Sequence, residues 1–399
     1  MLNLRIFFVL PFFSVGLSAQ QGWWQGKLLR TDGEVIVFNF EWKKEKENNS
    51  WYIKNGAERL RVDNIILKGD SVIVEMPLFE SQFRLTYADK KLSGSWIKQG
   101  ALQAVVMSFS AKKGTERFKI ASGNPVAVKG RWEVLFGIDT VRSRVGEFKQ
   151  SGAVVTGTIR TPSGDYRYLD GITTTDSIFL STFDGSNAYL FKGSADEDHI
   201  EGFFYSGATA KKSWTAFRND SAAVSEKSVA MQLRPGEDRL HFAFKDIDGN
   251  LISIADERFK NKVVVVQLMG SWCPNCMDET AFLSAYYKKN KSKGIEIVSL
   301  AYEYTTDFNR SVNSLRKFQK RFQVDYPMLV TGVTVMDSLR TEKTLPELTP
   351  IRFFPSSVII DKKGLVRKID TGFNGPATGE QYTIYKKNFE MLMKSLLRE

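Results

Sequence analysis

The sequence has few of the residues that bind metals or form structural disulfides. Among its 399 residues there are only two cysteines and two histidines. An exported protein stabilised by several disulfides would carry more cysteines, scattered along the chain. A zinc site needs four ligands, and neither His199 nor His241 is placed as part of a metal pair. We therefore expect neither a disulfide-rich scaffold nor a bound metal.

Long hydrophobic runs are also absent. An apolar run over residues 6–17 follows Arg5 and is followed by small residues ending at Ala19, which is typical of a secretory signal peptide. Its twelve residues, interrupted by Pro11, are too few to cross a bilayer, which takes about 20. We expect residues 1–19 to be a signal peptide and the mature protein to be periplasmic, without stable membrane insertion.

The charge is not concentrated in one part of the chain. The formal net charge is +11, but 56 Lys and Arg residues are mixed with 45 Asp and Glu residues along the whole sequence. Proteins that bind nucleic acid usually gather basic residues into a patch or a tail. We expect no nucleic-acid partner.

Aromatic residues are plentiful, with 29 Phe, 13 Tyr and 8 Trp. From about residue 22 to residue 219 they lie in short alternating runs separated by Gly, Asp and Asn, a pattern that predicts β-strands. The aromatic side chains could fill a core or line a ligand cavity, and the sequence leaves both possibilities open.

The β-rich region also repeats itself. Residues 63–74 resemble residues 169–180, and an offset of roughly 105 residues relates further positions. The pairs at this offset are Trp23 with Trp132, Phe79 with Phe183, and Gly94 with Gly202. Each copy is too long for a solenoid repeat, so we predict two similar antiparallel barrel or sandwich units over residues 20–125 and 126–219.

The pattern changes after a small, polar linker that we place at residues 220–237. Over residues 238–399, strands alternate with amphipathic helices, which predicts a layered α/β domain. Residues 263–269 are almost entirely apolar, as expected for a central strand that is covered on both faces.

Both cysteines lie directly after this strand, in the sequence Cys273-Pro274-Asn275-Cys276. Their spacing is that of a redox pair. A cysteine at a helix N-terminus is stabilised as thiolate, the attacking form in disulfide exchange, so we assign Cys273 as the nucleophile. Cys276, one turn into the helix, would resolve the mixed disulfide and form a Cys273–Cys276 disulfide. An inert structural disulfide is the alternative, but so short a loop would stabilise the fold very little.

A family resemblance follows from these residues. Residues 270–276, with Glu279 and the later segment 354–361, resemble the TlpA/ResA-like thiol–disulfide oxidoreductases of the thioredoxin superfamily. The resemblance covers roughly residues 238–399. It implies a thioredoxin-like fold, a cis-proline at Pro355, and a role for Glu279 in handling the proton of the buried cysteine. Gln267 departs from the pattern, because thioredoxins carry a buried acid there. Ser356 also stands where threonine is usual.

We also expect a substrate-binding surface around the pair and no cofactor. Its expected members are Trp272, Pro274, Asn275, Phe354, Pro355 and Ser356.

We therefore expect an exported protein disulfide reductase that acts on extracytoplasmic proteins. The β-rich region has no cysteine that could reduce the Cys273–Cys276 pair. The electrons for that pair would therefore come from a separate donor, a membrane thiol-relay protein. Two alternatives stay open: a ligand- or protein-binding β-region with an accessory redox domain, and a disulfide oxidase or isomerase.

Overall fold

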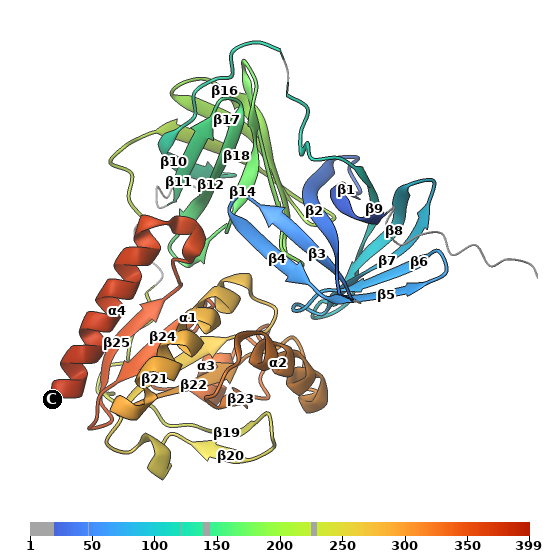
Figure 1. The fold of residues 1–399 in the computed structure, drawn as a ribbon. Coiled ribbons are helices and arrows are strands. Elements are labelled where there is room, and N and C mark those ends of the chain that lie inside the picture. Colours follow the sequence, from blue (N-terminus) through green and yellow to red (C-terminus); the bar gives the residue numbers. More distant parts are fainter. Residues whose placement is uncertain (1–19, 47, 121, 139–143, 225–229) are drawn as a thin grey trace, which may run out of the picture.

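The computed structural model describes residues 20–399 except 47, 121, 139–143 and 225–229 (Figure 1). The predicted signal peptide, residues 1–19, lies outside the described residues. Two β-rich units lead into a C-terminal α/β domain, and both units lie against one side of that domain (Figure 1).

The first β unit, unit 1, is one strongly curled antiparallel sheet of nine strands. Its order is β4-β3-β2-β1-β9-β8-β7-β6-β5, so the first and last strands of the unit pair and the barrel is open between β4 and β5. The strands are β1 (Gly22–Leu29), β2 (Val35–Glu45), β3 (Asn48–Asn55), β4 (Glu58–Val62), β5 (Asn64–Lys68), β6 (Ser71–Glu75), β7 (Ser81–Ala88), β8 (Lys91–Lys98) and β9 (Val105–Lys113).

The second unit, unit 2, repeats this plan and closes. Its order is β11-β10-β18-β17-β16-β15-β14-β12-β13, and an additional pairing of β11 with β12 completes the barrel. The strands are β10 (Gly130–Phe136), β11 (Val145–Ser151), β12 (Val154–Thr161), β13 (Gly164–Asp165), β14 (Leu169–Thr173), β15 (Ser177–Phe183), β16 (Ala188–Ala195), β17 (His199–Ser206) and β18 (Ala210–Arg218).

The repeat expected from the sequence exists, but one pairing was shifted by a residue. Trp24, not Trp23, is the counterpart of Trp132: each is fully buried and donates its indole N–H to the carbonyl four residues earlier, over 2.9 and 2.8 Å. Adjacent residues of a strand point to opposite faces, so only one of the two neighbouring tryptophans can enter the core. Gly94 and Gly202 are true counterparts, since a Cβ on either would collide with the backbone of the preceding strand.

Phe79 and Phe183 are not equivalent, contrary to expectation. Phe79 lies in the β6–β7 loop and packs into the core of the C-terminal domain. Phe183 ends β15 of unit 2 but packs into the core of unit 1, where its ring centroid is 4.4 Å from that of Phe38. A ring supplied by one unit therefore fills the core of the other.

Aromatic rings fill the core of unit 1. Phe40 and Trp51 are stacked with centroids 4.0 Å apart, and both are fully buried. Such contacts make these rings packing elements and disfavour the alternative in which they line a ligand cavity.

The C-terminal domain has a seven-stranded sheet in the order β20-β19-β23-β22-β21-β24-β25. β21, β22 and β23 are parallel, whereas β24 pairs antiparallel with β21 and β25 pairs antiparallel with β24. The strands are β19 (Ala243–Asp246), β20 (Leu251–Ser253), β21 (Val263–Met269), β22 (Ile295–Ala301), β23 (Met328–Val330), β24 (Ser356–Ile360) and β25 (Val366–Thr371). The helices are α1 (Pro274–Asn290), α2 (Phe308–Phe322), α3 (Arg340–Thr344) and α4 (Glu380–Arg398), with short 3-10 turns at Glu257–Phe259, Lys291–Lys293 and Pro376–Thr378. This β-α-β-α-β order followed by a β-hairpin and a helix is the thioredoxin-like fold.

The central strand β21 is buried on both faces, as its continuous apolar run predicted. Val263 and Val265 face α1, α2 and α4, whereas Val264 and Val266 face the layer formed by the chain around Leu240. This double cover fixes the end of β21, where the cysteine pair begins.

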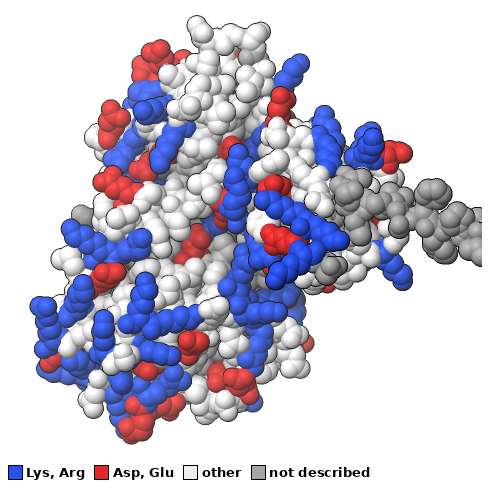
Figure 2. Space-filling model, in the orientation of Figure 1, with Lys and Arg blue, Asp and Glu red and all other residues white. Residues whose placement is uncertain are grey.

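Charged side chains of both signs are interspersed over the face in view (Figure 2). Within the described part of the chain, no helix combines the length and the apolar character needed to span a membrane.

Candidate active site

The cysteine pair lies where β21 leads into α1. Cys273 is the N-cap of α1 and Pro274 its first residue. The backbone N–H of Cys276 donates to Cys273 Sγ over 3.2 Å. The unpaired N–H groups and the positive end of the helix dipole both favour negative charge at that sulfur. Both cysteines are free thiols here, so this is the dithiol form, and the expected Cys273–Cys276 disulfide belongs to the oxidised form.

The two cysteines differ in their surroundings. Cys273 is 5% exposed, whereas Cys276 is fully buried. Burial raises the pKa of the Cys276 thiol well above its usual value, and the hydrogen bond and charge of Cys273 add to this shift. The inner cysteine is therefore held as a neutral thiol, while the outer one is closer to solvent and to the helix N-terminus.

The segment before β24 faces the outer cysteine. The Cys273 thiol donates to the carbonyl oxygen of Phe354 over 3.6 Å, and the peptide bond between Phe354 and Pro355 is cis, as the resemblance implied. Ser356 is buried and donates to the carbonyl of Phe353 over 2.9 Å, so its hydroxyl is used within its own loop.

Glu279 is fully buried beside the inner cysteine, on the same face of α1. One carboxylate oxygen accepts from Gln267 Nε2 and the other from Ser357 Oγ, both over 2.9 Å. Burial raises its pKa to about 7, although these two hydrogen bonds oppose the shift. Its negative charge also contributes to the raised pKa of Cys276. Glu279 is therefore a carboxyl group poised to exchange a proton near neutral pH.

Gln267 takes a different part from the one that the sequence suggested. The sequence suggests the loss of a buried acid at this position, whereas in the structure Gln267 holds Glu279 by a hydrogen bond. Ser357, the second partner, was not singled out at all. Its signal is a hydroxyl directly before the apolar run Val358–Ile360 of a central strand.

A second buried acid lies beside the turn that precedes the pair. Glu303 accepts from the Ser271 backbone N–H over 2.8 Å and from its hydroxyl over 2.6 Å, and burial raises its pKa to about 7. It fixes the turn that carries Trp272. The Trp272 indole donates to the carbonyl of Tyr302 over 2.9 Å and stacks on Tyr304 with centroids 5.2 Å apart.

Residues 235–383 match the model of the Redoxin family. The C-terminal domain is a redoxin domain. Two similar proteins are the thiol–disulfide oxidoreductases ResA of Bacillus cereus and of Bacillus subtilis. The first is 28% identical over 152 residues, which is 38% of this chain and 76% of the relative. The second is 28% identical over 137 residues, which is 34% of this chain and 67% of the relative.

Solved structures also align with this part of the chain. The thiol–disulfide oxidoreductase of Bacteroides fragilis is 17% identical with a TM-score of 0.29, covering 37% of this chain and 99% of its own. A thiol:disulfide interchange protein of the thioredoxin family from Chlorobium tepidum is 23% identical with a TM-score of 0.30. The match covers 42% of this chain and 99% of that protein.

The predicted substrate-binding residues of the redoxin domain do not all face open solvent. The carbonyl of Trp272 accepts from Ser186 Oγ over 3.1 Å, and that of Pro274 accepts from Arg167 over 3.3 Å. The Asn275 side chain lies against Gly164, where a Cβ would overlap with it. All three partners belong to unit 2, and sequence reasoning gave none of them a role.

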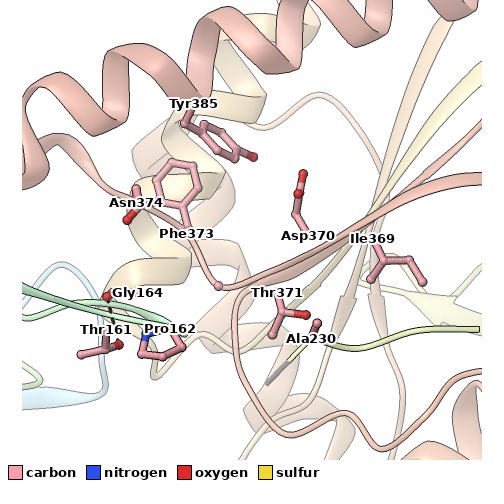
Figure 3. Close-up of a pocket in the computed structure, with 11 residues that line it drawn as sticks. Thr161, Pro162, Gly164, Ala230, Ile369, Asp370, Thr371, Phe373, Asn374 and Tyr385 are labelled. Carbon is pink, nitrogen blue, oxygen red and sulfur yellow. Dashed lines mark hydrogen bonds between the residues drawn. The ribbon is translucent and has the colours of Figure 1, made fainter. Parts of the chain in front are cut away.

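A small cavity of about 80 Å³ lies between unit 2 and the redoxin domain (Figure 3). Thr161, Pro162 and Gly164 line one side, and Asp370 of β25 and Tyr385 of α4 line the other (Figure 3). The cysteines are not among its lining residues. At this volume it holds a few water molecules at most. Among the described residues, no cluster of three or more His, Cys, Asp or Glu side chains could bind a metal.

Proposed function

We propose that this protein is an exported thiol–disulfide oxidoreductase that reduces disulfides of extracytoplasmic proteins. The observation that carries the proposal is the dithiol at the start of α1, with the Cys276 N–H donating to Cys273 Sγ and the carbonyl beside cis-Pro355 facing that sulfur. The similarity of the redoxin domain to ResA supports the same chemistry.

In this reaction the Cys273 thiolate attacks one sulfur of a substrate disulfide. A bond forms between Cys273 Sγ and that sulfur, and the other substrate sulfur leaves as a thiolate that takes a proton from water. The Cys276 sulfur then attacks Cys273 Sγ and releases the second substrate thiol. Two electrons pass to the substrate, and the pair is left as a Cys273–Cys276 disulfide.

Glu279 makes the second step possible at neutral pH. The Cys276 thiol must lose its proton before it attacks, and burial opposes its ionisation. A carboxylate with a pKa of about 7 on the same helix face is matched to accept that proton. Gln267 and Ser357 orient it through one hydrogen bond each.

The charges around the pair favour reduction of substrates over oxidation. Oxidases of this superfamily stabilise the thiolate of the reduced form strongly. Here Glu279 is a buried acid beside the pair, and its charge adds to the raised pKa of the Cys276 thiol. The dithiol is thereby a better electron donor. Because the chain has no third cysteine, regeneration needs a separate reductant, which we propose is a membrane thiol-relay protein in the periplasm.

Insulin reduction by the protein without residues 1–19 tests this proposal. With a small dithiol as the electron source, the protein should accelerate insulin precipitation, and Cys273→Ser should abolish the acceleration. Ser284→Ala, on the same helix but bonded only to the carbonyls of Phe322 and Gln323, is the matched control. A wild-type rate equal to that of Cys273→Ser would contradict the proposal.

A further inference from the structure

The two β units form one body. Asn55 of unit 1 and Phe183 of unit 2 exchange two hydrogen bonds, with the Asn55 amide donating over 2.9 Å and the Phe183 N–H over 3.2 Å. The backbone N–H of Gly56 donates to Asp170 over 3.0 Å. Together with the aromatic core shared at Phe183, these contacts join the two units.

Among the places where this body is attached to the redoxin domain, two differ in chemistry. The first is the β6–β7 loop of unit 1, which packs against α2 and is ion-paired with it. Arg310 donates to both carboxylate oxygens of Glu80 over 3.2 and 2.8 Å, and the Phe79 ring packs edge-on against Phe318. Phe79 and Glu80 both have a positive φ, of 69° and 45°, which non-glycine residues adopt only where surrounding contacts hold them. We call this contact the anchor.

The second attachment lies at the cysteine pair and is polar. Arg167 of unit 2 is ion-paired with Asp278 of α1 and donates to the Pro274 carbonyl over 3.3 Å. Its other carboxylate partners, Glu58 of unit 1 and Asp184 of unit 2, belong to the β body itself. Only the bonds to Asp278 and Pro274 cross to the redoxin domain, and we call them the latch.

The latch is accompanied by contacts that cover the turn before α1. Ser186 donates to the Trp272 carbonyl and itself accepts from Lys98 Nζ over 2.8 Å. Burial raises the pKa of the Tyr189 phenol, in β16, well above its usual value. The charge of Cys273 adds to this shift, which places Tyr189 near that sulfur. With this cover in place, Cys273 is only 5% exposed.

We propose that the two β units are a cap over Cys273: when it is closed, the cap keeps protein disulfides from that sulfur, and they reach Cys273 only when the latch is released. This inference rests on the proposed function, in which Cys273 is the nucleophile. The cap has no cysteine, so it cannot itself carry a disulfide to the site. Its contacts around the cysteines are polar, and polar groups regain water when they separate, which makes the latch easier to open than the apolar part of the anchor.

Alkylation of Cys273 in full-length Cys276→Ser protein tests the cap. N-ethylmaleimide and a maleimide carrying a long polyethylene glycol chain share one reacting group, so the ratio of their rates cancels any change in thiol reactivity. We expect the large reagent to react far more slowly than the small one. Adding Asp278→Asn should raise the ratio of large to small rates about tenfold or more, the effect of losing one charge-assisted contact. Arg167→Met should act in the same direction.

Asp325→Asn is the matched control, because Asp325 is paired with Lys291 inside the redoxin domain and should leave the ratio unchanged. A ratio in Cys276→Ser as high as that of an unstructured cysteine peptide would overturn the cap, and so would a ratio that neither latch variant changes. The measurement needs no turnover. A ratio that responds in a protein without insulin-reducing activity would therefore support the cap while the proposed function fails.

Discussion

Replacing Glu279 with Gln separates the two steps of disulfide exchange. The first step, attack by Cys273, does not involve the buried carboxyl group, whereas the second requires Cys276 to lose its proton. Positioned general bases accelerate such steps by about 10² to 10⁴. We therefore expect Glu279→Gln to slow the second step about 100-fold at pH 8 and to leave the first within about threefold.

The pH dependence gives the sharper expectation. The carboxylate accepts a proton only when it is ionised, and its pKa is about 7. In the wild-type protein the rate of the second step should rise as pH increases through about 7 and then level off. In Glu279→Gln that inflection should disappear.

An aromatic disulfide that releases a coloured thiolate resolves both steps in a stopped-flow experiment. The first coloured thiolate leaves when Cys273 attacks, and the second leaves when Cys276 resolves the mixed disulfide. Glu303→Gln is the matched control, because Glu303 is also a buried acid with a pKa of about 7 but is bonded to Ser271. If the rate of the second phase in Glu279→Gln still rose with pH through an inflection near 7, the proton-acceptor role would be refuted.

Three further outcomes are expected. Cys276→Ser should accumulate mixed disulfides through Cys273, visible on non-reducing gels, and trapping by Cys273→Ser instead would reverse the two roles. Folding raises the pKa of Glu279 and of Glu303 from 4.5 to about 7. As pH rises from about 5 to 8, these groups lose their protons first in the unfolded state, so the free energy of unfolding falls. Each group contributes about 3 kcal/mol at most to this loss, so melting temperatures should decline with pH, and less steeply in Glu279→Gln; an equal slope would contradict the assignment. Phe183→Ala should destabilise the β body by about 3–5 kcal/mol in tryptophan-monitored denaturation, whereas a change below about 1 kcal/mol would show that the two units do not share that core.

Local patterns predicted the place of the cysteine pair in the fold, because that place is encoded in a short stretch. Cys273 and Cys276 follow an apolar strand and begin a helix, and each of these features leaves a signal within about fifteen residues. The repeat was also visible, but two neighbouring tryptophans made its register ambiguous by one residue. Trp24 can be distinguished from Trp23 only by the face of the strand to which each ring points.

Contacts between distant segments could not be predicted in the same way. Gln267 looked like a missing acid because its partner, Glu279, lies on the next element and meets it only in the folded domain. Arg167 is one of 56 basic residues, and no local pattern indicates that it reaches the Pro274 carbonyl from another unit. Its left-handed backbone, with φ of 55°, became visible only in the structure.

The reduction potential of the Cys273–Cys276 pair decides whether the protein reduces or oxidises its substrates. Equilibration of the purified full-length protein with glutathione buffers, followed by mass spectrometry of the pair, gives this value. We expect a reversible two-electron couple on the reducing side of about −200 mV, close to thioredoxins. A potential near about −120 mV would make the protein an oxidase, and a pair that forms no disulfide would contradict the redox assignment altogether.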